Sequence, residues 1–463
     1  MNQRAATRCT CRRRGCGARA QGAGLALLVC LVLALAFICV PFVAGGCAQK
    51  AVTSTSLSAV TVTSASTAAP ATVTTVAVPV TQPREQETTT TGPQVIKIGA
   101  LFPLSGPLAP EGQSALKGMR LAVAEINQDG GIAALNGALL TLAEADSKGD
   151  AHGAEAEVTR LVQTEGVSAI VGAGQSTVAL DATDAAEKLG VPFVVSSGAA
   201  DEITGRGLAY TFRLCPKADW YARDQVTFLK SLKDLAGLDI SSVALLHENG
   251  EFGTQTAESQ KSYLAAAGIQ VVADVEYAPE QADLHNEVMA IRQSGAQAIL
   301  TATFLSDAAL IARAAAVLHV NLPIVDAAGG VLDPGFMAAA GDSAEKTMSV
   351  AEFAAGTAPS LTLEQKVAAS GMTLDADMLY GYQAVWVLAS AFQRSGSSEG
   401  PRIRAALATT ALYGDHLVLP QGLLTFDGTG QNRGARLLVV QVQGGRMLTV
   451  WPKEFAQATV LLP

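Results

Sequence analysis

Histidine is scarce in this chain of 463 residues, and the five that occur are too scattered to suggest a metal site. None shows a paired metal-ligand spacing, and His247-Glu248-Asn249-Gly250-Glu251 lacks the second histidine of a zinc-protease motif. A Gly-x-Ser-x-Gly elbow, a P-loop and a cysteine nucleophile context are also missing. The sequence therefore offers no catalytic residue, no metal ligand and no cofactor motif, and we expect no enzymatic activity.

Cysteine is almost confined to the N-terminal segment, which excludes a disulfide framework. Five of the seven cysteines lie within residues 1–46, and the other two are Cys47 and Cys215. If the segment is removed and Cys47 is modified, Cys215 has no partner for an internal disulfide. We expect Cys215 to be a buried, unreactive thiol, with a reactive sensor role as the alternative.

Acidic residues are absent from residues 1–46, which hold six arginines and then an apolar run from Leu25 to Val43. This layout is typical of a secretory signal peptide. The run closes on Ala44-Gly45-Gly46-Cys47, which resembles a lipobox apart from the alanine in place of the usual leucine. Cys47 is the expected lipidation site and first mature residue. An uncleaved membrane anchor is the alternative, and twin-arginine export is disfavoured because no Phe-Leu follows Arg13-Arg14.

Charge and composition describe the segments after the signal peptide. Removing the six arginines changes the formal net charge from −9 to −15, which argues against nucleic-acid or anionic-lipid binding by the exported part. Residues 47–94 begin with the lipidated cysteine and continue with Thr, Ser, Ala, Val and Pro, too few of them large and apolar to form a core. We interpret this stretch as a flexible tether that spans about 35–40 Å.

From residue 95 onward, short apolar strands alternate with segments of helical length. The first strand, 96–101, runs into Ser105-Gly106-Pro107, and the helix that follows ends at Asp129-Gly130-Gly131. Further strands are predicted over 139–142, 169–172, 192–195, 243–246, 269–272 and 298–301. The alternation predicts βαβ units, parallel sheets and right-handed crossovers. Ligands in such sheets bind beyond the carboxyl ends of the strands.

Several motifs follow one another in a characteristic order along residues 95–463. The strand and turn over 95–107 are followed by Gly190-Val191-Pro192 and Tyr210-Thr211-Phe212-Arg213, and later by Tyr380-Gly381-Tyr382-Gln383-Ala384-Val385 and a candidate hairpin at 422–430. No single motif is decisive, but the ordered set resembles the branched-chain amino-acid-binding proteins, the extracytoplasmic receptors of ABC importers.

This resemblance implies a type I periplasmic-binding-protein fold. Two Rossmann-like α/β lobes with parallel sheets would be joined by a three-segment hinge, with a ligand cleft between them. Lobe 1 would comprise 95–215 and 353–420, and lobe 2 would comprise 216–352 and 421–463. The resemblance also implies a monomer that passes an amino acid or a related small polar solute to the permease of an ABC importer. Lipidation at Cys47 would anchor it on the extracytoplasmic face of the membrane.

The first candidate ligand contacts lie at helix starts. Gly172-Ala173-Gly174 fails as a dinucleotide motif because Thr177 stands where the third glycine belongs. Gln175, Ser176 and Thr177 instead open a helix whose free amides and dipole favour a ligand carboxylate, with ordinary N-capping as the alternative. Ser105, in the turn before the first helix, is a similar candidate.

The loop 196–201 corresponds to a family loop in which an alanine carbonyl and a threonine hydroxyl hold the α-ammonium and carboxylate of the ligand. Gly198 and Ala199 would supply backbone groups, but Ala200 replaces the threonine. The family's acidic partner for the ammonium should fall near 328–330, where no acid stands. Asp326, and after it Asp201, are the candidate substitutes. The solute therefore need not be a free α-amino acid, and a neutral amide or a carboxylate with an apolar body fits better.

Two aromatic residues complete the candidate site. By the resemblance, Phe252 and Phe304 lie where the family commonly places aromatic side chains against the ligand from the second lobe. An ordinary core position is the alternative for both. At the level of the whole chain, the rival function is a ligand-sensing ectodomain for a separate signalling partner, and an enzyme is the weaker rival.

Overall fold

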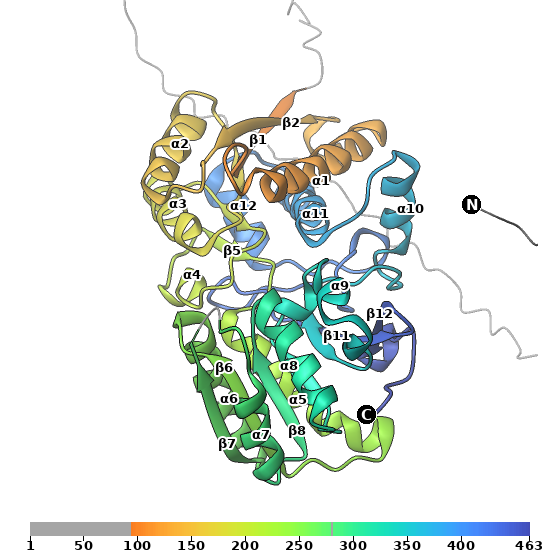
Figure 1. The fold of residues 1–463 in the computed structure, drawn as a ribbon. Coiled ribbons are helices and arrows are strands. Elements are labelled where there is room, and N and C mark those ends of the chain that lie inside the picture. Colours follow the sequence, from red (N-terminus) through yellow and green to blue (C-terminus); the bar gives the residue numbers. More distant parts are fainter. Residues whose placement is uncertain (1–93, 279–280) are drawn as a thin grey trace, which may run out of the picture. The chain divides into compact units, whose positions relative to one another are not determined.

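The computed structural model describes residues 94–278 and 281–463, which fold around two β-sheets (Figure 1). The predicted signal peptide, Cys47 and the tether lie outside these residues. Among the described helices, none combines the length and the apolar character needed to cross a membrane.

The first sheet has five parallel strands in the order β2-β1-β3-β4-β5. Residues on both of its faces are buried, as expected for parallel strands covered by helices on both sides. The sequence predicted the first four strands, whereas the three-residue β5 was noted only as a motif. The strands are β1 (Val95–Phe102), β2 (Leu139–Asp146), β3 (Ala169–Gly172), β4 (Phe193–Val195) and β5 (Thr211–Arg213).

The second sheet has seven strands in the order β12-β11-β10-β9-β8-β6-β7. Strands β6 to β10 are parallel, but β11 and β12 form an antiparallel hairpin at one edge, so the prediction of purely parallel sheets was incomplete. At the candidate hairpin, 422–430 contains no strand, but an isolated antiparallel bridge pairs Phe426 with Asn432 across the turn. The strands are β6 (Ser242–Glu248), β7 (Gln270–Tyr277), β8 (Ala298–Ala302), β9 (Ile324–Asp326), β10 (Met348–Ala351), β11 (Leu438–Gln443) and β12 (Arg446–Trp451).

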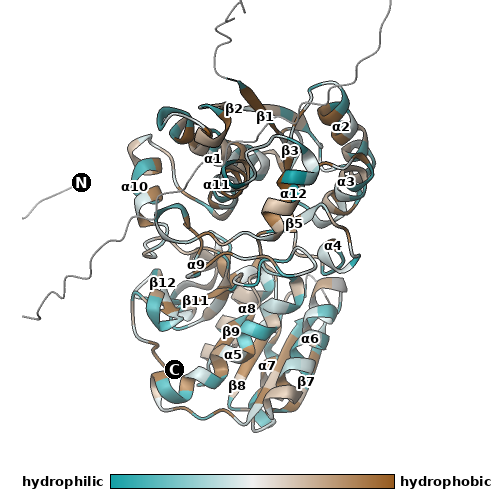
Figure 2. Cartoon of the chain, turned by 180° about the vertical axis from the view of Figure 1, so that it is seen from behind, coloured by the Kyte–Doolittle hydropathy of each residue, from teal (hydrophilic) through white to brown (hydrophobic). Residues whose placement is uncertain are grey.

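Helices cover both faces of each sheet, and Figure 2 shows apolar strands between helices that carry hydrophilic residues. On the first sheet, α2 and α3 pack on one face and α1, α11 and α12 on the other. On the second sheet, α5 and α6 pack opposite α7 and α8. The helices are α1 (Ala109–Gln128), α2 (Ala151–Gln163), α3 (Ser176–Leu189), α4 (Glu202–Gly205), α5 (Ala218–Ala236), α6 (Glu251–Ala267), α7 (His285–Gln293), α8 (Leu305–Val317), α9 (Phe336–Ala340), α10 (Leu361–Ala369), α11 (Ala376–Ser395) and α12 (Gly400–Ala408).

The chain passes between the two lobes three times. It leaves the first sheet after β5, returns after β10 to place α11 and α12 on the first sheet, and crosses again before β11. The carboxyl ends of β5 and β10 therefore each lead into a crossing segment. Parallel α/β sheets bind ligands at such ends.

Helices α1 and α11 approach each other closely because two glycines leave room. A Cβ atom on Gly118 would lie 2.0 Å from the Met378 carbonyl, and one on Gly381 would lie 2.2 Å from the Ala115 carbonyl. The contact is completed by Ser114, whose hydroxyl donates to Asp375 at 2.7 and 2.6 Å. This packing brings the first turns of the two helices together.

Candidate functional site

The N-terminus of α3 presents unoccupied amide groups just beyond strand β3. Gln175 occupies the N-cap position but makes no capping hydrogen bond. Among the described residues, the amides of Ser176, Thr177 and Val178 have no acceptor, and the first helical bond runs from the Ala179 amide to the Gln175 carbonyl at 2.9 Å. Free amides at the positive end of a helix dipole favour an anion. The geometry agrees better with a carboxylate site than with ordinary capping.

The loop after β4 adds further donors beside this helix start. The Ala200 amide donates to Ser176 Oγ at 3.1 Å, which ties the loop to α3. The amides of Ser197, Gly198 and Ala199 have no acceptor in the described part of the chain, and Ser197 Oγ is buried without a partner. Gly198 has a φ of +125°, a conformation that favours glycine. Two groups of unpaired amides therefore lie on adjoining segments.

The carbonyl groups of the same loop are already engaged by the protein. Arg213 Nη1 donates to the Gly198 carbonyl at 3.3 Å and to the Ala200 carbonyl at 2.6 Å. The Ala199 carbonyl accepts from the Ala218 amide at 2.7 Å. The loop therefore offers mainly donors to a ligand, and its geometry suits a carboxylate better than an ammonium group.

Arg213 holds this loop from below and is itself fully buried. Its Nε donates to Gln431 Oε1 at 2.6 Å and its Nη2 to Thr204 Oγ1 at 2.9 Å. Burial lowers the pKa of Arg213, an effect that nearby Cys215 and Asp201 oppose. No described carboxylate forms an ion pair with its guanidinium group. The buried cation therefore adds positive potential beneath the loop.

Ser105, another sequence candidate, is exposed but uses its hydroxyl within the protein. The hydroxyl donates to Asp146 Oδ2 at 2.6 Å, and the Ser105 amide donates to Oδ1 at 3.3 Å. Although burial raises the pKa of Asp146, the hydrogen bonds from Ser105 and neighbouring amides hold it below its ordinary value. Ser105 therefore links the turn before α1 to Asp146 at the end of β2.

The two aromatic candidates lie together on the second lobe. Phe252 belongs to the first turn of α6, which follows β6, and Phe304 precedes α8, which follows β8. Their ring centroids are 5.5 Å apart, and they are 37% and 54% exposed. Neither is a core residue, so the structure favours the pocket-wall interpretation over the core alternative.

Asp326, the predicted substitute for the missing acid, is fully buried. It accepts hydrogen bonds from the hydroxyls of Thr301 at 2.7 Å and Thr303 at 2.8 Å, and from the amides of Gly329 at 3.1 Å and Val331 at 3.4 Å. Burial raises its pKa, and these hydrogen bonds counteract the rise. Its oxygens are engaged in ordering the loop after β9, so the arrangement does not support Asp326 as the ammonium partner.

Asp201, the other candidate substitute, contacts Lys217 and Asp219 at the start of α5. Its Oδ2 lies 3.6 Å from Lys217 Nζ, and its Oδ1 accepts from the Asp219 amide at 3.4 Å. The ion pair with Lys217 already balances its charge. Neither substitute is therefore a free carboxylate.

Glu352, which the sequence analysis did not single out, lies where crossing segments meet. It follows β10 and accepts hydrogen bonds from the hydroxyls of Tyr221 on α5 and Tyr380 on α11. Burial raises its pKa, and the tyrosine hydrogen bonds oppose that rise. Cys215 contacts the donor loop, because its Sγ donates to the Gly198 carbonyl at 3.4 Å. Burial is the main cause of the raised pKa of the Cys215 thiol, and the charge of Glu352 raises that pKa further. The sequence signal was a polar residue at the carboxyl end of a strand.

Histidine and cysteine contribute no reactive centre to this region. Within residues 94–278 and 281–463, no cluster of His, Cys, Asp and Glu could hold a metal ion. Cys215 is buried, and burial raises the pKa of its thiol, as expected for an unreactive cysteine.

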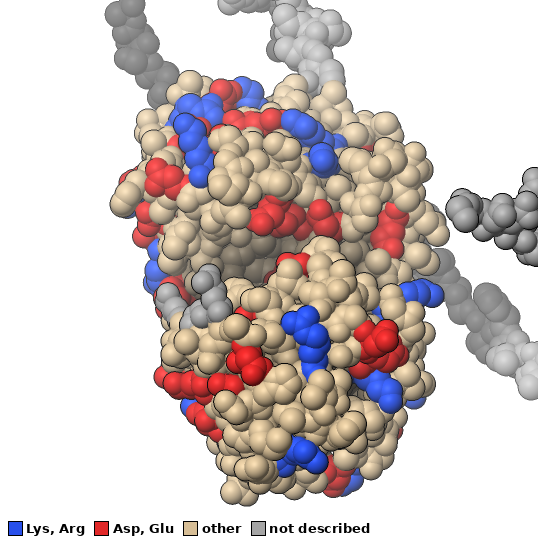
Figure 3. Space-filling model, viewed as in Figure 1, with Lys and Arg blue, Asp and Glu red and all other residues tan. Residues whose placement is uncertain are grey.

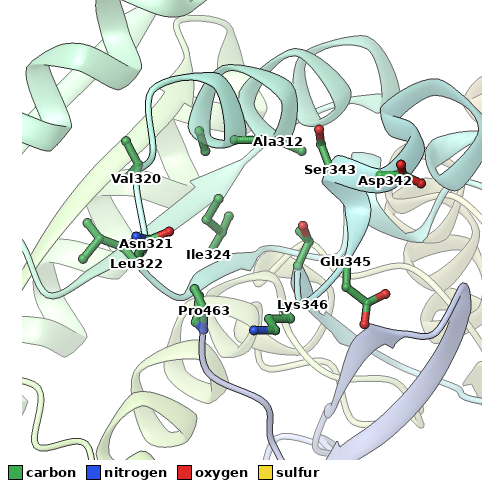
Figure 4. A pocket seen from close by; sticks show the side chains of 13 residues that line it. Ala312, Val320, Asn321, Leu322, Ile324, Asp342, Ser343, Glu345, Lys346 and Pro463 are labelled. Carbon is green, nitrogen blue, oxygen red and sulfur yellow. The ribbon is translucent and has the colours of Figure 1, made fainter.

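A separate cavity of about 270 Å³ lies at the opposite edge of the second sheet (Figure 4). Its lining includes Ile324, the first residue of β9, and Thr347, which precedes β10. It therefore opens at the amino ends of these strands. Because ligands of parallel α/β sheets bind at the carboxyl ends, we do not assign the solute to this cavity.

The chain has two α/β lobes that are joined by three crossing segments, and hydrogen-bond donors gather at the carboxyl ends of the strands in the first lobe. These features define a two-lobed binding protein. The family described as periplasmic binding protein matches residues 95–446, and the chain belongs to this family. Within it, the chain is 30% identical over 385 residues to Leu/Ile/Val-binding protein homolog 7 of Brucella abortus, which covers 80% of this chain and 94% of the relative. The resemblance to branched-chain amino-acid-binding proteins is thereby confirmed, as is the expectation of a binding protein in place of an enzyme.

Solved structures share the fold at lower identity. One is the branched-chain amino acid transporter substrate-binding protein LivJ from Streptococcus pneumoniae in complex with isoleucine, with 23% identity, a TM-score of 0.59, and coverage of 80% of this chain and 100% of that chain. Another is a solute-binding protein of an ABC transporter from R. palustris in complex with benzoate, with 19% identity, a TM-score of 0.56, and coverage of 80% and 98%. The type I two-lobed fold predicted from the sequence is confirmed.

Proposed function

We propose that this protein captures a small carboxylate-bearing solute with an apolar body between its lobes and delivers it to an ABC importer. The observation that carries the proposal is the set of unpaired amides at the α3 N-terminus and in the loop 196–200, above the buried Arg213. The exposed pair Phe252 and Phe304 would cover the apolar body when the lobes close.

The ligands of similar proteins support a carboxylate as the common feature. Isoleucine, bound by LivJ, carries a carboxylate and an ammonium group, whereas benzoate, bound by the R. palustris protein, carries only the carboxylate. In this chain the loop carbonyls are engaged and no acid stands near 328–330, so an α-ammonium group lacks the partners that the family resemblance would supply. Binding of free leucine, isoleucine or valine should therefore be weak.

Two variants of Ser176 test the carboxylate site. Ser176→Ala removes the hydroxyl, and Ser176→Pro also removes the amide donor at a helix position that tolerates proline. The extended backbone of Gln175, with φ −117° and ψ 144°, is compatible with a following proline. We expect Ser176→Ala to weaken carboxylate binding by about 1–2 kcal/mol and Ser176→Pro by about 1 kcal/mol more. Calorimetry with leucine, isoleucine, benzoate, hexanoate and 6-aminohexanoate measures both.

The melting temperature separates this interpretation from helix capping. Both variants should melt within a few degrees of the wild type, because the free protein loses only the part-buried hydrogen bond from the Ala200 amide to Ser176 Oγ, which is worth about 1 kcal/mol. Equal affinity of the two variants for the best carboxylate, together with a lowered melting temperature, would instead assign Ser176 to structure. A wild type that binds none of the carboxylates would contradict the proposed function itself.

The proposed anchoring rests on the sequence of the N-terminal segment and is tested independently. If Cys47 carries a diacylglyceryl group, Cys47→Ser should release the protein from the membrane fraction or leave a heavier, unprocessed precursor. Fractionation and mass spectrometry of the processed chain check this. A variant with the mass and membrane fraction of the wild type would exclude lipidation at Cys47.

A further inference from the structure

The cavity of about 270 Å³ in the second lobe lies at the strand ends opposite to those that face the first lobe. The carboxyl ends of β5 and β10 lead into segments that cross between the lobes, and Figure 3 shows a hollow between the two lobes. The cavity opens instead at the amino ends of β9 and β10, beside α8 (Figure 4). A single water needs only about 10–15 Å³. The cavity therefore has room for a small organic molecule.

One side of this cavity is apolar. It is lined by Ala312 and Ala315 of α8, by Ile324 at the start of β9, and by Val320 from the loop between these elements. All four are buried, so the cavity extends into the body of the lobe. The small alanine side chains leave space that larger side chains would fill. A ligand with an apolar body would remove this wall from water, which favours binding.

The polar side of the cavity includes a buried hydroxyl without a partner. Thr347 is 5% exposed, and it borders both this cavity and a smaller one of about 10 Å³. Its amide donates to the Ala344 carbonyl at 3.1 Å and its carbonyl accepts from the Val442 amide at 3.0 Å, but its hydroxyl makes no hydrogen bond with any described residue. Buried polar side-chain atoms are mostly hydrogen-bonded. A polar atom of a ligand in the cavity would supply the missing partner.

Lys346 adds a positive charge to the same side of the cavity. It is half-buried and forms no ion pair with any described carboxylate. Its amide donates to the Val442 carbonyl at 2.8 Å, and its carbonyl accepts from Gln441 Nε2 at 3.0 Å. These bonds fix its backbone at a φ of +68°, a conformation that favours glycine. The backbone therefore gives no reason for a lysine at this position, whereas a bound anion would.

Two acidic residues also border the cavity, but they do not neutralise Lys346. Both oxygens of Glu345 accept from the Gly444 amide at 3.0 Å, and Figure 4 shows the side chain pointing toward the β11–β12 hairpin. Asp342 is exposed and points away from Ile324 in the same view. The Lys346 side chain instead extends toward Pro463, which also lines the cavity. The cavity thus presents one cation and one hydroxyl to a monoanion.

We propose that this cavity is a second binding site, which takes the anion of a medium-chain fatty acid. The carboxylate would lie against the Lys346 ammonium group and the Thr347 hydroxyl, and the hydrocarbon chain would pack against α8 and Ile324. The lysine favours a carboxylate over a neutral alcohol, and the apolar wall favours a long chain over acetate. Because this site lies apart from the amides of α3 and the loop 196–200, the inference goes beyond the proposed function.

Calorimetry with octanoate tests the second site in the Ser176→Pro background, where the solute site is weakened. Octanoate should bind at least about tenfold more tightly than octan-1-ol or acetate, since hydrogen bonds to a charged group have roughly that effect. Lys346→Met keeps the apolar stem and should weaken octanoate binding about tenfold. Thr347→Val keeps the shape of the side chain and should weaken it about fivefold. The control Lys230→Met removes an exposed lysine of α5, on the other face of the sheet, and should bind within about twofold.

Two further measurements keep the test decisive. Thr347→Val should melt no lower than its parent, because the hydroxyl has no partner in the protein, whereas a structural hydroxyl would lower the melting temperature and leave the affinity unchanged. An octanoate with a diazirine at its far end should label residues 312–324 of otherwise wild-type protein, and this does not depend on the folding of Ser176→Pro.

The outcomes separate this inference from the proposed function. Octanoate binding that requires Lys346 but not Ser176 supports the second site, whether or not the solute site takes carboxylates. Labelling outside 312–324, octan-1-ol that binds as tightly as octanoate, or octanoate binding that Lys346→Met and Thr347→Val leave intact would overturn the second site. Carboxylate binding that requires only Ser176 would overturn it while the proposed function stands.

Discussion

Asp326 on the second lobe and Asp377 on the first are both withdrawn from solvent, and burial raises the pKa of each. Their surroundings nevertheless differ in kind. Asp326 accepts four hydrogen bonds from two threonine hydroxyls and two amides. Asp377 accepts none from the described residues and has three carboxylates as neighbours. A buried acid whose oxygens are hydrogen-bonded orders a loop, whereas an acid without hydrogen-bond donors costs stability when it ionises.

The same contrast extends to the two lobes around the cleft. Among the described residues, the first lobe offers unpaired amides at Ser176 and in the loop 196–200, together with the carboxylate of Asp377, which accepts no hydrogen bond. The second lobe offers the exposed rings of Phe252 and Phe304, and its polar groups near Asp326 are paired with one another. This division suggests that the first lobe selects the solute by charge and that the second covers it on closure.

Removing the hydrogen-bonded carboxylate of Asp326 should have the largest effect on stability. Asp326→Ala leaves the Thr301 and Thr303 hydroxyls and two amides without their acceptor in a buried loop. We expect the free energy of unfolding to fall by about 3–5 kcal/mol. Urea denaturation followed by circular dichroism measures this loss.

A second substitution at the same position separates structure from ligand binding. Asp326→Asn keeps one acceptor oxygen and should lose only part of the stability, about half of the loss in the alanine variant. At a temperature where this variant is folded, its affinity for carboxylates should match the wild type. A loss of affinity in folded Asp326→Asn would show instead that Asp326 contacts the solute, as the sequence alone suggested.

Much of the fold could be predicted from the sequence because its patterns are local. Apolar runs of strand length and the glycine stop after Gln128 reflect burial and backbone conformation, and these properties act over a few residues. The antiparallel pair β11 and β12 was not predicted, and the candidate hairpin at 422–430 is a turn with a single antiparallel bridge between Phe426 and Asn432. Pairing of distant strands is decided by tertiary contacts, which a single sequence does not display.

The candidate site was predictable where a helix start marks it and not where distant segments meet. Ser176 could be found because it follows a buried strand and opens a helix. Asp377 could not, because Asp375-Ala376-Asp377 has the pattern of an ordinary helix cap. Only the close approach of α1 and α11, together with Glu352 from beyond β10, reveals its unbalanced charge.

Replacing Asp377 should change the free energy of unfolding by a smaller amount than replacing Asp326, and in the opposite direction. The pKa of Asp377 is about 7 in the folded protein and near its ordinary value of 3.8 when unfolded, so the folded state binds more protons between these values. Stability should therefore fall as the pH rises from about 4 to 7, and the full cost remains above pH 7. Asp377→Asn should raise the free energy of unfolding by about 1–2 kcal/mol at pH 8, after allowance for solvent screening, and change it little at pH 4. Urea unfolding at both pH values measures the difference, and the control Glu155→Gln, which removes an exposed acid that pairs with Lys188, should lie within about 0.5 kcal/mol of wild type. If Asp377→Asn were destabilising at both pH values, Asp377 would be a structural acid like Asp326, and the distinction between the two aspartates would be lost.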